Sequence, residues 1–446
     1  MSPVTSSPTK AGRCWYARPF LPVSHHATEK SPYYPPSKFG QDSSDDNNGG
    51  KSKVFPVGTT DTFSKSLSWT LLLARIFGLL PVSAKTQATV TSFLAIFGTA
   101  GMTLLGLHWC FLNFTVFRAT KVVFYGSATL SCVLLHRLGK AWPRLSNVWR
   151  HAEVSTKHLG YRPHTTLICR TFTALYCLVA VVEHAFAIIN AIVNVYECSA
   201  RNVFRRFFSR WFPQLLTVLP YTPALTPLVL MLNTLATFTF SFLDLLIFNL
   251  AFCLSSMFWA FNRQLVEASK QTISRPRWSD WYRDYNVLRR LVTIVDNHIS
   301  PIVLLSFIIN VYHICLQLYL SLTPLPTLAS KAYFCLSFGF LMSRTITVCL
   351  ASASIHDLAK QPKFVIFSVP SEEFDEEVER FQFQVCNDSV AISAMRFFIL
   401  TRTTLVTVIG LAATYEVVMF QIQTMAEEET DMKRLSAHNL TTDVCE

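Results

Sequence analysis

Charged side chains are scarce in this sequence. Asp, Glu, Lys and Arg make up 15% of its 446 residues, whereas apolar residues make up 51%. A soluble domain carries roughly a quarter charged residues, so this composition favours a membrane protein. The net charge of +11 does not indicate a nucleic-acid partner, because the basic residues lie in loops between long apolar runs. They are better interpreted as signals of membrane topology.

The sequence also lacks the cysteine spacing of a disulfide scaffold and an apolar signal peptide. Most of its twelve cysteines lie in apolar runs, where they act as small hydrophobes. Cys198 and Cys445 fall in segments expected outside the cell, where they could pair. The first sixty residues are polar, with a Ser, Asp, Asn and Gly run at 43–50, which predicts a disordered tail. The first membrane helix is therefore expected to act as the insertion signal.

Seven apolar stretches approach the roughly 20 residues that a membrane-spanning helix needs. The first five lie between Lys85 and Arg118, Lys121 and Arg137, Thr171 and Val195, Arg210 and Arg263, and Asp296 and Lys331. The sixth starts at Ala332 and contains Arg344, and the seventh runs from about Thr403 to Met425. The second is short, so we expect its two flanking basic residues to extend toward the membrane surface. The fourth is too long for one straight span, so part of it must project beyond the bilayer or form a loop.

The distribution of Lys and Arg orients these spans. The loops after the second, fourth and sixth spans are the more basic ones, which predicts a cytoplasmic N-terminus and an extracellular C-terminus. The glycosylation sequons at Asn113 and Asn439 then lie outside. This topology argues against a G-protein-coupled receptor. The absence of a visible internal repeat argues against the common secondary-transporter plans.

Several short motifs occur together in a specific order. In the last span, Thr414 and Tyr415 precede Gln421, although Ile422 stands where the pattern has an aromatic residue. Further matching stretches are residues 140–143, 183–185, 219–223 and 397–402. Over residues 65–425 the sequence resembles the arthropod gustatory receptors, in particular the sugar-sensing branch.

The resemblance implies an all-α membrane protein with seven transmembrane helices and the fold of the insect chemoreceptor channels. It implies a sugar-gated, non-selective cation channel in the plasma membrane of taste neurons, not an enzyme, without cofactor or metal. The implied partners are a mono- or oligosaccharide, membrane lipid, and related subunits in a homo- or hetero-tetramer. The expected divisions are a cytoplasmic tail (1–64), helices one to five with cytoplasmic extensions (65–323), an anchor segment and helices six and seven with the pore (324–425), and an extracellular tail (426–446).

Polar residues inside the spans are costly and usually mark function. They form stripes at helical spacing on the third to sixth spans, which predicts a shared outward-facing cavity. A sugar needs carboxylates and amides for its hydroxyls and aromatic rings for its apolar faces. The candidate ligand-binding residues are Glu183, Asn190, Asp244, Asn310, Tyr312, Gln317 and Tyr333. Alternatively, Asp244 or Glu183 pairs with Arg344 inside the bundle, and the Asn and Ser residues hold helices together.

The last span carries the candidate pore. Val417 or Val418 lies on one helical face with Gln421, so valine can form a hydrophobic gate and the amide a neutral polar ring. Tyr415 and Glu416 lie on other faces, and together with Arg344 they are the candidate couplers between ligand site and pore. Simple packing is the alternative for Tyr415.

Before the last span, residues 374–385 place Phe374, Val378, Phe381 and Val385 at helical spacing. This pattern predicts an amphipathic cytoplasmic helix.

Two other classes compete with the receptor hypothesis. A transporter for a small polar solute predicts substrate uptake without channel currents. A metal-dependent membrane hydrolase needs clustered His and carboxylate ligands, but the candidate histidines are scattered over different helices and depths. They are His184, His298, His313 and His356.

Overall fold

The structure is a computed structural model that describes residues 61–81, 86–198, 203–270, 275–322 and 328–442. Cys445 lies outside the described residues, and so do the side chains of Cys198 and Asn439. The predictions of a disulfide and of glycosylation at Asn439 therefore concern parts that the structure does not describe.

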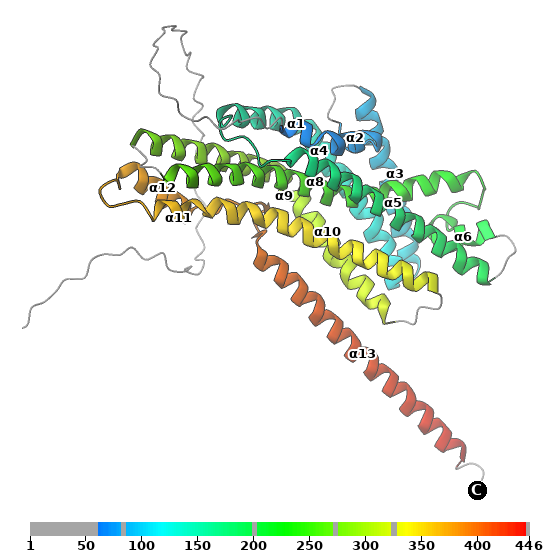
Figure 1. The fold of residues 1–446 in the computed structure, drawn as a ribbon. Helices are drawn as coiled ribbons and strands as arrows, with labels where there is room; N and C mark the ends of the chain where they lie inside the picture. The colour runs from blue at the N-terminus through cyan, green and yellow to red at the C-terminus, as the bar shows by residue number, and fades with distance from the viewer. Residues whose placement is uncertain (1–60, 82–85, 199–202, 271–274, 323–327, 443–446) are drawn as a thin grey trace, which may run out of the picture. The chain divides into compact units, whose positions relative to one another are not determined.

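Seven described helices are long and apolar enough to cross a membrane, which confirms the predicted all-α membrane architecture (Figure 1). They are α3 (Thr86–Leu112), α4 (Val116–Ser155), α5 (Thr165–Cys198), α8 (Leu225–Ser269), α9 (Arg275–Ser321), α10 (Leu328–Lys360) and α13 (Arg402–Thr442). The shorter elements are α1 (Phe63–Ser66), α2 (Ser68–Ile76), α6 (Val203–Trp211), α7 (Pro213–Leu216), α11 (Pro362–Ile366), α12 (Glu376–Asn387), β1 (Ser393–Ala394) and β2 (Phe398–Ile399).

Several helices extend well beyond the apolar stretches that predicted them. The second span was expected between Lys121 and Arg137, yet both residues lie inside the 40-residue α4. Trp142 and Trp149 on the extension of α4 are buried, so packing of one face maintains the helix where the sequence turns polar. Hydropathy identifies only the part that crosses lipid, and it misses such extensions.

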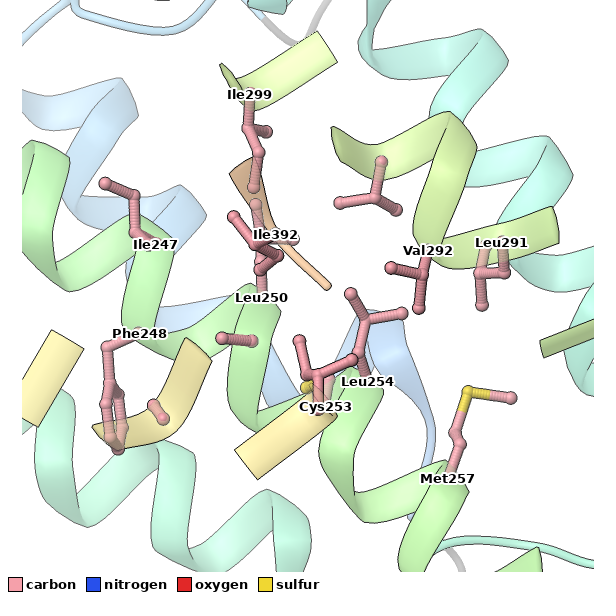
Figure 2. Packing of buried hydrophobic residues seen from close by; sticks show 14 of the residues in the cluster. Ile247, Phe248, Leu250, Cys253, Leu254, Met257, Leu291, Val292, Ile299 and Ile392 are labelled. Atoms are coloured by element: carbon pink, nitrogen blue, oxygen red, sulfur yellow. The ribbon is translucent and has the colours of Figure 1, made fainter. Parts of the chain in front are cut away.

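Helix α8 forms the centre of the bundle. It packs against α4, α5, α9 and α10, and residues on both its outer and inner halves are buried. Figure 2 shows its inner half, where Leu250, Cys253 and Leu254 lie near Val292 and Ile299 of α9. The prediction that the long fourth apolar stretch exceeds one span is confirmed, since it contains the short helix α7, a connection and most of the 45-residue α8.

The predicted amphipathic helix is present as α12, with one correction. Asp375 caps its N-terminus by accepting a hydrogen bond from the Val378 nitrogen at 3.0 Å. Val378, Phe381 and Val385 are fully buried, as their spacing predicts. Phe374 precedes the cap and is exposed, so its inclusion on the buried face was wrong.

A two-stranded hairpin connects α12 to α13. Strands β1 and β2 pair antiparallel, and Met395 and Arg396 between them adopt positive φ values of 50° and 63°. Asp296 of α9 accepts hydrogen bonds from the Ser393 nitrogen at 2.6 Å and from the Ser393 hydroxyl at 2.8 Å. These bonds attach the hairpin to α9 and so set where α13 begins.

Helix α13 contacts the bundle mainly through α9 and α10 and then runs away from the other helices (Figure 1). The helix continues to Thr442, through most of the segment expected as a tail after residue 425. Of its most apolar stretch, only 6% of the residues are buried. Within the described part of this chain, most of the surface of α13 is therefore not covered by other helices.

Candidate functional site

A cavity of about 300 Å³ lies among α4, α5, α8, α9 and α10, in the half of the bundle where α6 also lies. This volume is at the lower end of the range typical of small-molecule sites. By the positive-inside rule this is the extracellular half of the bundle. The polar stripes predicted from the sequence therefore do converge on one hollow.

Three side chains form a hydrogen-bonded chain in the cavity wall. The Ser337 hydroxyl donates to Glu183 Oε1 at 2.8 Å and accepts from Gln317 Nε2 at 3.0 Å. Gln317 Oε1 is buried and has no hydrogen-bond partner among the described residues. An unpaired buried acceptor is costly, so this oxygen is a ready partner for a ligand hydroxyl.

A buried ion pair closes the inner end of the cavity. Arg344 is 4% exposed and Asp244 1% exposed, and Arg344 Nε lies 3.3 Å from Asp244 Oδ2. Asp244 also accepts hydrogen bonds from the Ser306 hydroxyl and, at 3.1 Å, from the Asn310 amide. Arg344 donates to Asn310 Oδ1 at 2.8 Å and to the Ser241 hydroxyl at 3.2 Å. Such a pair is tolerated in a membrane because every charge has several polar partners.

The two charges do not have the same access to the cavity. Arg344 lines it, whereas Asp244 and Asn310 lie behind Arg344 and are not part of its wall. The Arg344 guanidinium lies 4.8 Å from the centre of the Phe240 ring and 6.0 Å from that of Phe340. Asp244 and Asn310 therefore hold the arginine in position, and the arginine faces the cavity between two aromatic rings.

A second hollow of about 260 Å³ adjoins the first. The two share Phe117, Lys121, Ala187, Trp211 and Tyr333 in their linings. The second adds Asn190 and Arg210. Asn190 accepts a hydrogen bond from Ser330 at 2.9 Å. The shared rings give both hollows apolar faces beside polar groups.

The predicted ligand residues thus divide into three groups. Glu183, Gln317 and Tyr333 line the main cavity, and Asn190 lines the adjoining hollow. Asp244 and Asn310 lie behind Arg344. Tyr312 lines neither hollow, and its hydroxyl donates to Thr120, which does line the cavity, at 3.3 Å.

The sequence reasoning missed several lining residues. Lys121 was interpreted only as a residue flanking the second span, and Trp211 received no role, yet both line the two hollows. Phe117, Lys121 and Phe124 recur at helical spacing on α4 and all line the main cavity. This helical spacing in the sequence could have identified the three residues as one cavity-facing side of the helix.

The proposed pore and coupling residues differ in exposure. Val417 is 56% exposed, Val418 45%, and Gln421 is also exposed. Tyr415 and Glu416 are half-buried. Within the described chain, the face carrying Val417 and Gln421 has almost no packing partner.

The two remaining predictions concern glycosylation and metal. Asn113 is exposed in the short connection between α3 and α4. Within the described ranges, no three His, Cys, Asp or Glu side chains converge in a way that could hold a metal ion.

Known proteins similar to this chain identify its family. The sequence model of the trehalose receptor family matches residues 56–432. The chain is 32% identical to the Drosophila melanogaster gustatory receptor 5a for trehalose, over 67% of this chain and 68% of that receptor. It is 28% identical to the Drosophila melanogaster gustatory receptor for sugar taste 64f, over 81% of each chain.

Solved structures agree on the fold. The olfactory receptor OR5 of Machilis hrabei in complex with eugenol superposes with a TM-score of 0.55 at 14% identity, covering 81% of this chain and all of the other. A second structure of the same receptor gives a TM-score of 0.57 at 12% identity, covering 80% of this chain and 97% of the other. At this identity the likeness concerns the fold alone. Together with the sequence matches, it leads to one conclusion: the chain belongs to the trehalose receptor family, the sugar-sensing branch of the insect gustatory receptors, and is a multi-pass membrane receptor rather than an enzyme.

Proposed function

We propose that this receptor is a sugar-gated, non-selective cation channel of the plasma membrane. The observation that carries the proposal is the cavity of about 300 Å³ that combines the Glu183–Ser337–Gln317 chain with aromatic rings. Two of its relatives are named for trehalose and for sugar taste, so a disaccharide is the first ligand to test.

The binding chemistry follows from the wall of the cavity. Glu183 accepts hydrogen bonds from sugar hydroxyls, and the unpartnered Gln317 Oε1 accepts another. Trp211 and Tyr333 offer ring faces to the C–H surfaces of the sugar. Arg344 donates to hydroxyl oxygens at the inner end, held there by Asp244. Sugar binding therefore depends both on the hydrogen-bonding groups and on the aromatic ring faces of the cavity wall.

Opening requires that the sugar bind the open state more tightly than the closed one. The ligand contacts α5, α9 and α10, and two of these helices, α9 and α10, also contact α13. When these helices close around the sugar, the surface of α9 and α10 that contacts α13 moves. Tyr415 and Glu416 are half-buried and act as couplers between this surface and the pore.

The pore itself is completed by other subunits. The exposed face of α13 that carries Val417, Val418 and Gln421 lines a central pathway between four copies of the chain or of related receptors. The valines close it by dewetting, and a ring of Gln421 amides contacts the passing cation. Neutral amides replace part of the hydration shell without strongly selecting one cation.

The test is expression of the full chain in oocytes or cultured cells, with current recording during application of trehalose, sucrose, glucose, fructose and a sugar alcohol. We expect an inward cation current for at least one sugar and none in cells without the receptor. Labelled-sugar uptake is measured in the same cells. Uptake without current would contradict the channel proposal in favour of a transporter.

A further inference from the structure

A third cavity, distinct from the main cavity and the adjoining hollow, lies at the opposite end of the bundle. It has a volume of about 240 Å³ and lies between the inner parts of α8 and α10, where α13 begins. Its lining includes Arg162 from the α4–α5 connection, Trp259 of α8, Asp357 of α10, Gln361 and Arg402 of α13. The cavity shares no lining residue with the two outer hollows.

We place this cavity at the level of the cytoplasmic membrane surface. The apolar stretch of α13 that is long enough to cross a membrane begins at Arg402, so we place the inner edge of that span near Arg402. Tryptophan is enriched at this level of membrane proteins, and Trp259 is half-buried there. The surrounding connections are the basic ones that the positive-inside rule assigns to the cytoplasm.

The charge at this cavity is positive and incompletely paired. The guanidinium groups of Arg162 and Arg263 lie 5.6 Å and 5.4 Å from the centre of the Trp259 ring. In the described part of the chain, no carboxylate lies within ion-pair distance of either arginine. Arg402 pairs with Asp357 at 2.7 Å, and both remain partly exposed. Arg162 and Arg402 line the cavity together with one carboxylate, Asp357, and Arg263 lies next to the lining Trp259 without being part of the wall.

An amide group adds a positioned donor. Gln361 Oε1 accepts a hydrogen bond from Asn262 Nδ2 at 3.0 Å, and Asn262 also donates to the Leu358 carbonyl at 2.8 Å. These contacts hold the Gln361 side chain at the cavity wall with its amide nitrogen available. Guanidinium and amide donors around a small hollow are the groups that recognise phosphate oxygens.

We propose that this cavity binds a phosphomonoester-bearing headgroup of an anionic lipid in the cytoplasmic leaflet, such as a phosphorylated phosphatidylinositol. Basic pockets between membrane helices on the cytoplasmic side suit such headgroups. The phosphate binds Arg162 in the cavity wall and Arg263 beside the lining Trp259, both of which lack a carboxylate partner among the described residues, and it competes with Asp357 for Arg402. Because Arg402 begins α13, the lipid acts on the base of the pore helix. This site is independent of the sugar proposal, since binding is measured without sugar.

The experiment uses the full chain in nanodiscs of zwitterionic lipid. Binding of an eight-carbon-chain phosphatidylinositol bisphosphate is measured for wild type, for Arg162→Gln/Arg263→Gln, and for Arg144→Gln/Arg150→Gln. The last pair removes the same charge from exposed positions on the inner part of α4. We expect the affinity of the first variant to fall at least about tenfold, because charge-assisted hydrogen bonds are lost. The control variant should stay within about twofold of wild type, since surface charges away from the site contribute little.

Three outcomes would overturn the proposal. Unchanged binding by Arg162→Gln/Arg263→Gln removes the site, and an equal loss in the control shows non-specific charge attraction. Free inositol trisphosphate is the third comparison, because it carries the same phosphates without acyl chains. We expect it to bind at least about tenfold more weakly; equal affinity through the same arginines would assign a soluble anion and contradict the lipid. Arg162→Lys/Arg263→Lys keeps the charge if the glutamine variant does not fold, and should bind with intermediate affinity because lysine cannot form the bidentate contact.

Discussion

Helices α8 and α13 are both long and apolar enough to cross a membrane, but their surroundings in the chain are opposite. In the most apolar stretch of each helix, 78% of the residues of α8 are buried, against 6% for α13. The carboxylate of Asp244 on α8 has three polar partners on neighbouring helices. The exposed face of α13 has no comparable set among the described residues. The comparison teaches that one chain supplies the whole wall of the main cavity, whereas it leaves most of α13 without packing partners among the described residues.

The largest effect is expected on the α8 side, from Asp244→Leu. This change leaves Arg344 buried without its carboxylate, and breaking a buried pair costs about 3–5 kcal/mol. Surface expression and the thermal-unfolding midpoint in detergent should fall sharply. Asp280→Asn at an exposed position should leave both within error. Asp244→Leu/Arg344→Met should recover part of the loss, and a stable single variant would contradict the structural importance of the pair.

The next effect is expected at the cavity wall, from Glu183→Gln. The amide still accepts a hydrogen bond from Ser337, but it accepts ligand hydroxyls without charge assistance. The half-maximal sugar concentration should rise about tenfold, with surface expression unchanged. Glu267→Gln, at an exposed position paired with Lys270, is the matched control. An unaltered sugar response in Glu183→Gln would remove this carboxylate from the binding site.

The exposed face of α13, the second region of the comparison, is tested by Gln421→Glu. A ring of carboxylates in place of amides should raise the permeability of divalent cations relative to sodium several-fold, without changing the half-maximal sugar concentration. Reversal potentials in calcium and sodium solutions measure this ratio. Met419→Gln, two residues away and so on another side of the helix, should leave it unchanged. Selectivity identical to wild type in Gln421→Glu would mean that Gln421 does not face the pathway.

The smallest effect concerns the cytoplasmic surface, where His158 lies 2.7 Å from the buried Asp284. The hydrogen bond to Asp284 raises the pKa of His158 above its usual value of about 6.5, against an opposing effect of partial burial. A raised pKa means that the contact stabilises the fold fully below about pH 6.5 and loses this contribution as the pH rises through the higher value. Because His158 is half exposed, the contribution should be below about 1 kcal/mol.

This contribution is measured as the unfolding midpoint of the wild type and of His158→Gln between about pH 6 and pH 8. The difference between the two should be largest at acidic pH and should shrink as the pH rises. His151→Gln, at an exposed position on α4, serves as the control. A difference that is constant across this range would show that the ion pair does not titrate.

The polar residues of the spans show how far local patterns carry. Glu183, Gln317 and Tyr333 share one cavity because helical periodicity places them on inward faces, which can be seen without coordinates. The respective positions of Asp244 and Arg344 could not be predicted. Which of two paired charges faces the hollow depends on how α8, α9 and α10 approach each other. Lys121 shows the same limit, since a flanking lysine and a lining lysine look alike in sequence.

By itself, the sequence determined the number and order of the spans, their orientation and the family, because hydropathy, charge bias and short motifs are local properties. The tertiary structure alone decided which helix lies at the centre and which has most of its surface uncovered by other helices. It also placed Arg344 between Phe240 and Phe340 in front of Asp244. It also assembled the inner cavity from residues as distant along the chain as Arg162 and Arg402. The physical reason is that lipid selects for apolar composition alone, whereas packing between helices selects partners by shape and charge.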